Sequence, residues 1–399
     1  MARLQTDWFA VFILFAAGLC AAMQFAKVVP VIEMIGHDLG LGLVASSFAV
    51  SILGLVGVAF AITIGRAVNS IGLSRALLFA LFGGALFAAL GALAPTATLF
   101  LVSRFAEGFS HLLIAICAPT LMTAHTTAKD RPIALALWAC FFGLGFALNS
   151  AAAPLIVPDY GWRNFLLAHA AIMFLIGCLV HIAVKRSGYR NSRSALPNLS
   201  EIRAAHFAVI QSKVPLLLAL TFCGYTIQFL AILTFLGLFL TNVQQWDQNQ
   251  VGSYLAFASI ITLLFTLGSG FLVRLGVSLF IGLATAFTGL IGTAIGVFIL
   301  QPQDVLLSIL IIVMMACFGL LPGFIFANVP TIASTPVLAT LIYGAIALFG
   351  NLGTFLGTPL FAISYNIMGW AGGAAFMIAM SMLGLVFAVA LNVRIKQPM

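Results

Sequence analysis

The sequence contains very few charged side chains. Only 7% of its 399 residues are Asp, Glu, Lys or Arg, whereas about a quarter of the residues of a soluble globular protein are charged. This shortage excludes a soluble protein. The chain instead has 63% hydrophobic residues and a mean hydropathy of +1.20, which indicates a protein that crosses the bilayer many times.

Paired cysteines, metal-binding patterns and catalytic motifs are also absent from the sequence. The six cysteines lie singly in apolar segments, with no CxxC and no His at zinc spacing, so we expect neither disulfides nor a metal site. No GxSxG, HExxH, phosphate-binding loop or paired carboxylates occur, and we predict neither an enzyme nor an ATP-driven pump, and no cofactor. The net charge of +8 is spread between apolar runs, which argues against nucleic-acid binding.

Long apolar runs, separated by polar, Gly or Pro positions, predict twelve transmembrane helices. Each run exceeds the about 17 residues that a helix needs to cross the hydrocarbon core, and in lipid the backbone must be satisfied within the segment. We therefore expect an all-α membrane protein with two bundles of six helices. The predicted helices cover residues 8–32, 43–64, 76–94, 98–122, 133–155, 164–184, 214–241, 251–273, 278–299, 304–328, 337–361 and 368–391.

Lys and Arg are concentrated on one side of the predicted membrane. With a cytoplasmic N-terminus, fourteen Lys and Arg of the loops and chain ends lie on that side, and only Arg163 lies in a loop on the other. This positive-inside pattern predicts that both termini are cytoplasmic, in a bacterial inner membrane. The first apolar run continues to Ile32, so we interpret it as an uncleaved helix rather than a signal peptide.

A basic connection of residues 185–213 separates the predicted halves, which are residues 1–184 and 214–399. It carries six Lys or Arg against one Glu. Its second half, from Ser200, has apolar residues among polar ones, and both a short interfacial helix and a solvated linker fit this composition.

Breaks of similar sequence follow the second and the eighth predicted helices. Gly65 and Gly72 bracket the first break, and Gly270 and Gly276 bracket the second. A repeated six-helix unit is typical of secondary transporters, whose substrate site lies between the repeats near the middle of the membrane.

Three ionisable residues interrupt the fourth predicted helix. Arg104, Glu107 and His111 are spaced i, i+3 and i+7, which places them on one helix face within an arc of about 60°. The first predicted helix adds Gln24 and Lys27. Because charges within the bilayer are costly and nearly always face a cavity or a partner, the pattern predicts a polar interior.

These features together resemble the major facilitator superfamily. The superfamily motif between helices two and three, Gly-x-x-x-Asp-Arg-x-Gly-Arg-Arg, is matched by Gly65, Gly72 and Arg75, whereas Asn69 and Ser70 replace its Asp and Arg. The resemblance implies a charge-based lock at the cytoplasmic face, and these replacements weaken it. The predicted gating residues are Gly65, Asn69, Gly72 and Arg75.

Two further motifs carry the resemblance. Arg104 and Gly108 fit the Arg-x-x-x-Gly pattern of the fourth helix, and Gly161-Trp162-Arg163 resembles the GWR found between helices five and six. The stretches RFAEG, APT and APL are most similar to the cyanate-transporter-like branch. The Gly-Pro-x-x-Gly-Gly ending that is typical of drug antiporters is absent from the fifth predicted helix, which disfavours drug efflux.

The resemblance implies that helices one, four, seven and ten line a central cavity. Two cations and one carboxylate in its N-terminal half leave that half net positive, which favours an anionic solute. The predicted substrate-binding residues are Lys27, Arg104, Gln24, His111, Tyr225 and Gln228.

We expect a monomeric secondary transporter in the lipid bilayer that moves a small anionic solute by alternating access. Glu107, the one acidic residue deep in a predicted helix, is the predicted proton-coupling residue. Other interpretations stay open: Arg104 and Glu107 as a structural pair, His111 as a packing residue, and Lys27 extended to the membrane interface. Alternative functions are an efflux antiporter for hydrophobic drugs or metabolites, and a non-transporting membrane sensor or scaffold.

Overall fold

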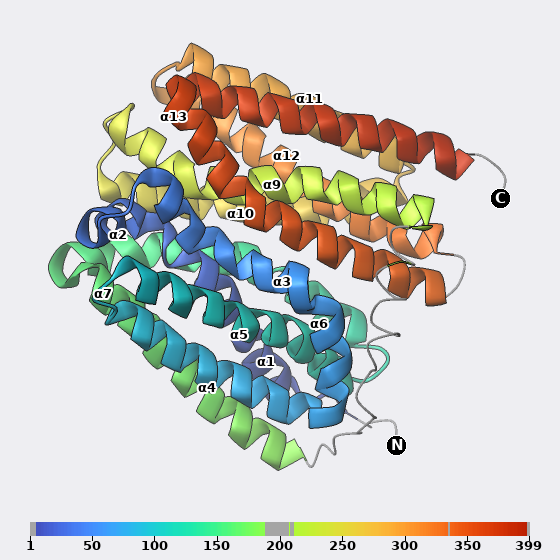
Figure 1. Ribbon diagram of the computed structural model, residues 1–399. Helices are drawn as coiled ribbons and strands as arrows, with labels where there is room; N and C mark the ends of the chain where they lie inside the picture. Colours follow the sequence, from blue (N-terminus) through green and yellow to red (C-terminus); the bar gives the residue numbers. More distant parts are fainter. Residues whose placement is uncertain (1–4, 188–206, 208–210, 334–335, 397–399) are drawn as a thin grey trace.

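The computed structural model describes residues 5–187, 207, 211–333 and 336–396, and these residues form helices and no β-strand (Figure 1). The prediction of an all-α membrane protein is confirmed for this part of the chain. The predicted basic linker and the interfacial helix within it lie almost entirely outside the described residues.

The first half of the chain forms one half of the molecule, drawn in blue to green in Figure 1. Its first helix starts where Asp7 accepts a hydrogen bond from the backbone N–H of Ala10, at 3.1 Å. Such a cap satisfies one of the free N–H groups of a helix start. The elements of this N-terminal group are α1 (Trp8–Ala26), η1 (Val29–Val31), α2 (Ile32–Leu39), α3 (Leu43–Ile71), α4 (Leu73–Ala92), α5 (Ala97–Ala124), α6 (Arg131–Ala139) and α7 (Phe141–Ser187).

The second half of the chain forms the other half of the molecule, drawn in yellow to red. The start of α1 and the end of α13 lie at one end of the molecule, here named the terminal end. The opposite end, with α2 and the turn between α9 and α10, is named the far end. The elements of this C-terminal group are α9 (Lys213–Asn242), α10 (Gln248–Arg274), α11 (Leu279–Ile295), η2 (Gly296–Leu300), α12 (Asp304–Ile332) and α13 (Pro336–Lys396).

Ten candidate membrane spans are found among the described residues. Two of them, Phe141–Arg186 and Leu341–Ile395, are 46 and 55 residues long, about twice the length that one crossing needs. Each contains a turn at a glycine with positive φ, 74° at Gly161 and 60° at Gly369, a backbone conformation that glycine adopts without strain. Figure 1 shows α13 running to the far end and returning.

The fifth predicted helix, residues 133–155, is interrupted in the structure. α6 ends at Ala139 and α7 begins at Phe141, because the N–H of Cys140 bonds to the carbonyl of Leu137, three residues back. A tightened turn of this kind leaves no trace in hydropathy, since the residues on both sides are equally apolar.

The two groups of helices meet along two seams, α3 against α13 and α7 against α10. Small residues allow the backbones to come close there. A Cβ atom at Gly54 would lie 2.9 Å from the carbonyl oxygen of Asn351 and from the nitrogen of Phe355. A Cβ atom at Gly252 would lie 2.7 Å from the carbonyl oxygen of Ser150. A side chain at either glycine would therefore separate the two groups.

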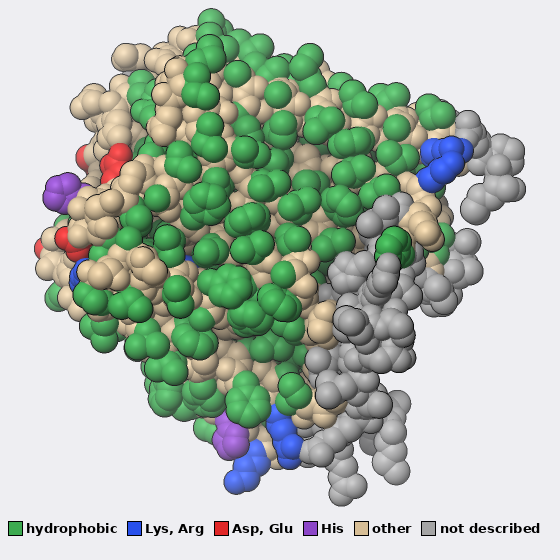
Figure 2. All heavy atoms as spheres, in the orientation of Figure 1, with side chains coloured by type: hydrophobic (Ala, Val, Ile, Leu, Met, Phe, Trp, Pro, Cys, Tyr) green, Lys and Arg blue, Asp and Glu red, His purple; other side chains and the backbone are tan. Residues whose placement is uncertain are grey.

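The visible face of the molecule is covered by hydrophobic side chains, and charged side chains lie toward its two ends (Figure 2). Many large apolar side chains are exposed at the surface, such as Leu155 at 73% and Ile367 at 74%. This distribution suits a surrounding of lipid tails, with the charged ends in the two aqueous phases.

Candidate functional site

A buried charge cluster joins α1 to α5. Oε2 of Glu107 accepts hydrogen bonds from Nζ of Lys27 at 2.7 Å and from Nη1 of Arg104 at 2.6 Å. All three residues are 0% exposed. The i, i+3 spacing brings Arg104 and Glu107 to one face of α5, as predicted, and the fold adds Lys27 from 80 residues away.

Lys27 occupies the end of α1. The helix stops at Ala26 because Pro30, in the following turn, has no N–H with which to continue the hydrogen-bond ladder. Lys27 is therefore the C-cap residue, where a positive charge complements the negative end of the helix dipole. The end of α1 thus determines the position of the Lys27 ammonium group.

Arg104 ties three helices together. Its Nε donates to the carbonyl of Ala49 on α3 at 2.8 Å, and its Nη2 donates to the carbonyl of Gln24 on α1. With the bond to Glu107, the guanidinium fork uses all three of its nitrogens. This pattern exploits the planar geometry that distinguishes arginine from lysine.

His169 on α7 is part of the same cluster, although it is not among the predicted site residues. Its Nδ1 lies 3.4 Å from Nζ of Lys27, and its Nε2 lies 3.2 Å from the carbonyl oxygen of Cys20. A carbonyl oxygen only accepts, so Nε2 carries the proton and Nδ1 accepts from Lys27; these partners assign the tautomer. The feature of the sequence that could have indicated His169 is that a polar side chain deep in an apolar helix is costly unless it has a partner.

The cluster holds two cations and one carboxylate, which leaves one net positive charge among its described members when all three are ionised. Glu107 uses Oε2 for both ion pairs, and its buried Oε1 has no hydrogen-bond partner among the described residues. An unbalanced charge and an unused carboxylate oxygen are both costly in a low-dielectric interior. The arrangement is therefore suited to take up a proton or an anion.

His111 and the side chain of Gln24 lie outside the charge cluster. Nδ1 of His111 contacts the carbonyl of Ala21 at 2.9 Å, and its ring meets the ring of Phe25 edge-on at 4.8 Å. The amide of Gln24 donates to the hydroxyl of Ser110 at 3.0 Å. Of these two predicted binding residues, only the backbone carbonyl of Gln24 touches the cluster.

Gln228 and Tyr225 on α9 meet different neighbours, although they are only three residues apart. The amide of Gln228 donates to the carbonyl of Gly224 at 2.6 Å and accepts from the hydroxyl of Ser381 on α13 at 2.8 Å. Its hydrogen bonds are therefore satisfied within the C-terminal group. The ring of Tyr225 stacks on Phe229 at 5.2 Å.

Tyr225 belongs to a series of aromatic rings that crosses between the two groups. Phe25 on α1 lies 6.0 Å from Phe142 on α7, and Phe142 lies 6.5 Å from Phe229 on α9, measured between ring centroids. Phe229 also contacts Phe318 on α12 at 5.3 Å. Aromatic rings of α1, α7, α9 and α12 thus contact one another across the boundary between the groups, and the charge cluster lies within the N-terminal group.

Comparison with known proteins identifies the family. The family model named Major Facilitator Superfamily matches residues 14–358. The chain belongs to the major facilitator superfamily. The structure of this chain is similar to the crystal structure of a D-xylose-proton symporter, with a TM-score of 0.76, 14% identity and coverage of 97% of both chains. It is also similar to an inward-facing, occupied bacterial homologue of the human lysosomal transporter Spinster, with a TM-score of 0.74, 12% identity and coverage of 97% and 98%.

A sequence relative adds a partial match. The multidrug efflux pump LfrA of Mycolicibacterium smegmatis is 26% identical over 167 residues, which are 42% of this chain and 33% of the pump. The match thus spans about a third of the length of that relative. Membership of the superfamily and the transporter structures point to a membrane transporter rather than an enzyme. The finer placement in the cyanate-transporter-like branch stays a prediction.

The superfamily motif between helices two and three lies at the turn from α3 to α4. Gly72 has φ 97°, and α4 begins at the next residue, so this glycine makes the turn possible. Arg75 is exposed in the first turn of α4. Gly65 and Asn69 lie within α3, at positions whose side-chain environment is outside the described part of the structure. The gating role of the four residues stays a prediction.

The GWR stretch that resembles the superfamily is located at the far end. The indole N–H of Trp162 donates to Asp38 at 3.1 Å, and Arg163 donates to the carbonyl of Ala92 at 2.8 Å and lies 3.4 Å from Asp38. These bonds attach the turn of α7 to α2 and to the end of α4. The motif thus braces the far end of the N-terminal group.

The two groups of this transporter are bonded to each other at the far end. The side-chain amide of Asn242, at the end of α9, donates to Glu33 on α2 at 3.0 Å. Deeper in the structure, the hydroxyl of Thr358 on α13 donates to the carbonyl of Ser47 on α3 at 3.0 Å. These two hydrogen bonds therefore cross the boundary between the groups.

Proposed function

We propose that this protein is a proton-coupled secondary transporter that moves a small anionic solute by alternating access. The helices make twelve crossings, because α7 and α13 supply two each, and both termini lie in the cytoplasm. The observation that carries the proposal is the fully buried cluster of Lys27, Arg104 and Glu107, in which positive charge exceeds negative charge.

Glu107 is the proton-coupling residue of this proposal. When it is ionised, its Oε2 holds both cations. A proton on the carboxyl group, at the unpartnered Oε1, weakens both ion pairs and leaves two cations with no carboxylate. These cations then attract an anion more strongly, so the proton and the anion favour each other's binding.

The size of this coupling follows from electrostatics. Two unit charges about 6 Å apart interact by about 3 kcal/mol at an effective dielectric constant of about 20. Removing the carboxylate charge at such a distance changes the affinity for an anion roughly 100-fold. A coupling of this size is enough to drive uptake of an anion with a pH gradient.

The test is transport by purified protein in lipid vesicles. In the Glu107→Gln variant, uptake of an anion driven by an inward proton gradient should disappear, while exchange of the same anion across the membrane should continue. The matched control is Glu33→Gln, because Glu33 lies at the far end and an amide oxygen can still accept from Asn242. Gradient-driven uptake at the wild-type rate in the Glu107 variant would exclude the proposed coupling site.

Efflux of a hydrophobic drug or metabolite is the second candidate function. The aromatic series through Phe142 and Phe229 favours it, since aromatic rings bind apolar and cationic ligands, and LfrA is a multidrug efflux pump. A thermal-shift screen with small anions and with lipophilic cations separates the two functions. Stabilisation by lipophilic cations alone supports efflux, whereas stabilisation by small anions that is lost in Arg104→Ala supports the leading proposal.

A further inference from the structure

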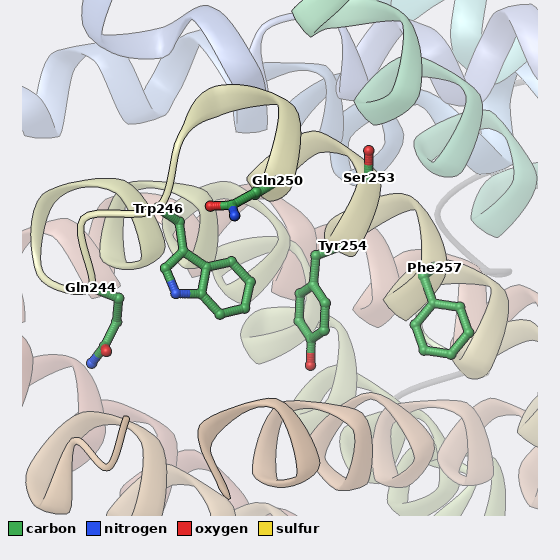
Figure 3. A pocket seen from close by; sticks show the side chains of 6 residues that line it. All are labelled: Gln244, Trp246, Gln250, Ser253, Tyr254 and Phe257. Atoms are coloured by element: carbon green, nitrogen blue, oxygen red, sulfur yellow. The ribbon is translucent and has the colours of Figure 1, made fainter. Parts of the chain in front are cut away.

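A second site lies away from the charge cluster, at the far end of the C-terminal group. A cavity of about 680 Å³ opens there beside the turn from α9 to α10. Figure 3 shows the rings of Trp246, Tyr254 and Phe257 in a row, with two amide side chains near the indole and Ser253 pointing away. The residues that line the cavity are Gln244, Trp246, Gln250, Ser253, Tyr254 and Phe257.

The turn that forms one wall of this cavity is held by its own hydrogen bonds. The N–H of Trp246 donates to the carbonyl of Leu240 at 3.0 Å. Asp247 and Gln250 form a reciprocal capping box at the start of α10, with bonds of 2.9 and 3.2 Å. A capping box fixes the entry of the chain into a helix. The indole and the amide of Gln250 are thus positioned before any ligand binds.

The opposite wall is attached to α12. The hydroxyl of Tyr254 donates to the carbonyl of Ser308 at 2.6 Å, and the rings of Tyr254 and Trp246 meet edge-on at 5.2 Å. The cavity is therefore a groove along the turn before α10 and the start of α10, and its aromatic wall is fixed at both ends. Trp and Tyr are enriched at the level of the lipid headgroups, and both lie here within the first two turns of α10 or just before it.

The groove is polar at one end and apolar at the other. Gln244 and Gln250 lie beside the indole, and none of the six lining residues is charged. Phe257 is 47% exposed, and Ile260 and Leu264, at 42% and 55% exposure, continue the exposed face of α10 toward the middle of the helix. The occupant that this surface suits has a hydrogen-bonding head and an apolar tail.

We infer that the groove binds a phospholipid with an ethanolamine headgroup from the leaflet at the far end. The amides and the indole N–H donate to phosphodiester oxygens, and the tail lies along Phe257. None of the lining residues is a cation that would select an anionic lipid. The exposed carboxylate of Asp247, the N-cap residue of α10 beside the lining residue Trp246, repels an anionic headgroup and can accept from a primary ammonium. This site is independent of the proposed transport function.

Native mass spectrometry of the full-length protein in detergent tests the inference by titration with phosphatidylethanolamine. Gln250→Glu keeps an acceptor for the N–H of Asp247 but replaces the donor amide with a negative charge. Trp246→Phe keeps a ring but removes the indole N–H. Each variant should bind the lipid at least fivefold more weakly. Gln303→Ala is the matched control, since Gln303 is exposed at the same end and makes no side-chain cap, and it should bind as the wild type does.

The wild-type protein provides a second measurement that does not depend on folding of a variant. Phosphatidylcholine, whose ammonium has no N–H, and anionic phosphatidylglycerol should each bind at least threefold more weakly than phosphatidylethanolamine. Equal binding of the three lipids, or wild-type affinity in both cavity variants, overturns the inference. If soluble glycerophosphoethanolamine binds as tightly as the whole lipid, the groove takes a solute from the aqueous side and the lipid assignment is wrong.

Discussion

Replacing Glu107 with Gln removes one charge from the cluster and leaves its shape almost unchanged. Nζ of Lys27 and Nη1 of Arg104 lie 2.7 and 2.6 Å from the same carboxylate oxygen, so they are at most 5.3 Å apart, the sum of these two distances. At that separation two positive charges repel by about 3 kcal/mol at an effective dielectric constant of about 20. Breaking a buried ion pair by removing one partner costs about 3–5 kcal/mol in proteins. We therefore expect the free energy of unfolding to fall by about 3–5 kcal/mol.

A double-mutant cycle isolates the part of this loss that comes from the Lys27–Glu107 pair. Lys27→Met leaves Arg104 and Glu107 as a neutral pair. In that background Glu107→Gln removes only the attraction between the carboxylate and Arg104, whereas in the wild type it removes the attractions to both Lys27 and Arg104. In the Lys27→Met background we therefore expect Glu107→Gln to cost about 3 kcal/mol less than in the wild type. The assay is reversible unfolding by denaturant in mixed micelles at pH 7, with Glu33→Gln as the exposed control. An equal cost in both backgrounds would refute the charge-balance argument.

Three further predictions follow from contacts described by the structure. His169→Phe removes the acceptor of Lys27 and should lower the free energy of unfolding by about 1–3 kcal/mol, measured in the same micelles. Hydrogen bonds from Thr6 and Thr127 lower the pKa of the half-buried Asp130, so its contribution to stability is present above about pH 4 and is lost as the pH falls through the lowered pKa. Asp130→Asn should therefore reduce the melting temperature more at pH 7 than at pH 2.5. Gly54→Val should reduce transport at least tenfold, because its side chain separates α3 from α13, whereas Gly83→Val on α4, where a Cβ contacts only Phe87 at 3.9 Å, should transport normally.

The helices were the most predictable part of the fold. Apolar runs locate helices well because the bilayer leaves the backbone few alternatives, and α9, α10 and α12 begin and end within a few residues of their predicted bounds. The interruption at Cys140 was not predictable from hydropathy. It depends on whether the N–H of Cys140 bonds to the carbonyl three residues back, as it does here, or four residues back as in a continuous α-helix. The residues around Cys140 are apolar in either case, so hydropathy does not distinguish the two.

The candidate site was predictable only in part. The spacing of Arg104 and Glu107 on one helix determines that they share a face, and the cost of their burial indicates that a partner exists. His169 lies 142 residues from Lys27 in the sequence, and no local pattern connects the two. Gln228 shows that spacing alone does not determine a contact. Residues three apart on a helix differ in direction by about 60° around the helix axis, and here this directs Gln228 to Ser381 and Tyr225 to the aromatic series.

The guanidinium of Arg104 has a mechanical consequence. Its three bonds reach α1, α3 and α5 from a single rigid plane, so no two of these helices can slide past each other while the bonds persist. In a conformational cycle that keeps these three hydrogen bonds intact, α1, α3 and α5 must move together as one rigid body. Relative movement then takes place at the seams between the two groups of helices, where Gly54 and Gly252 lie. The side chain of Arg104 keeps α1, α3 and α5 together during that movement.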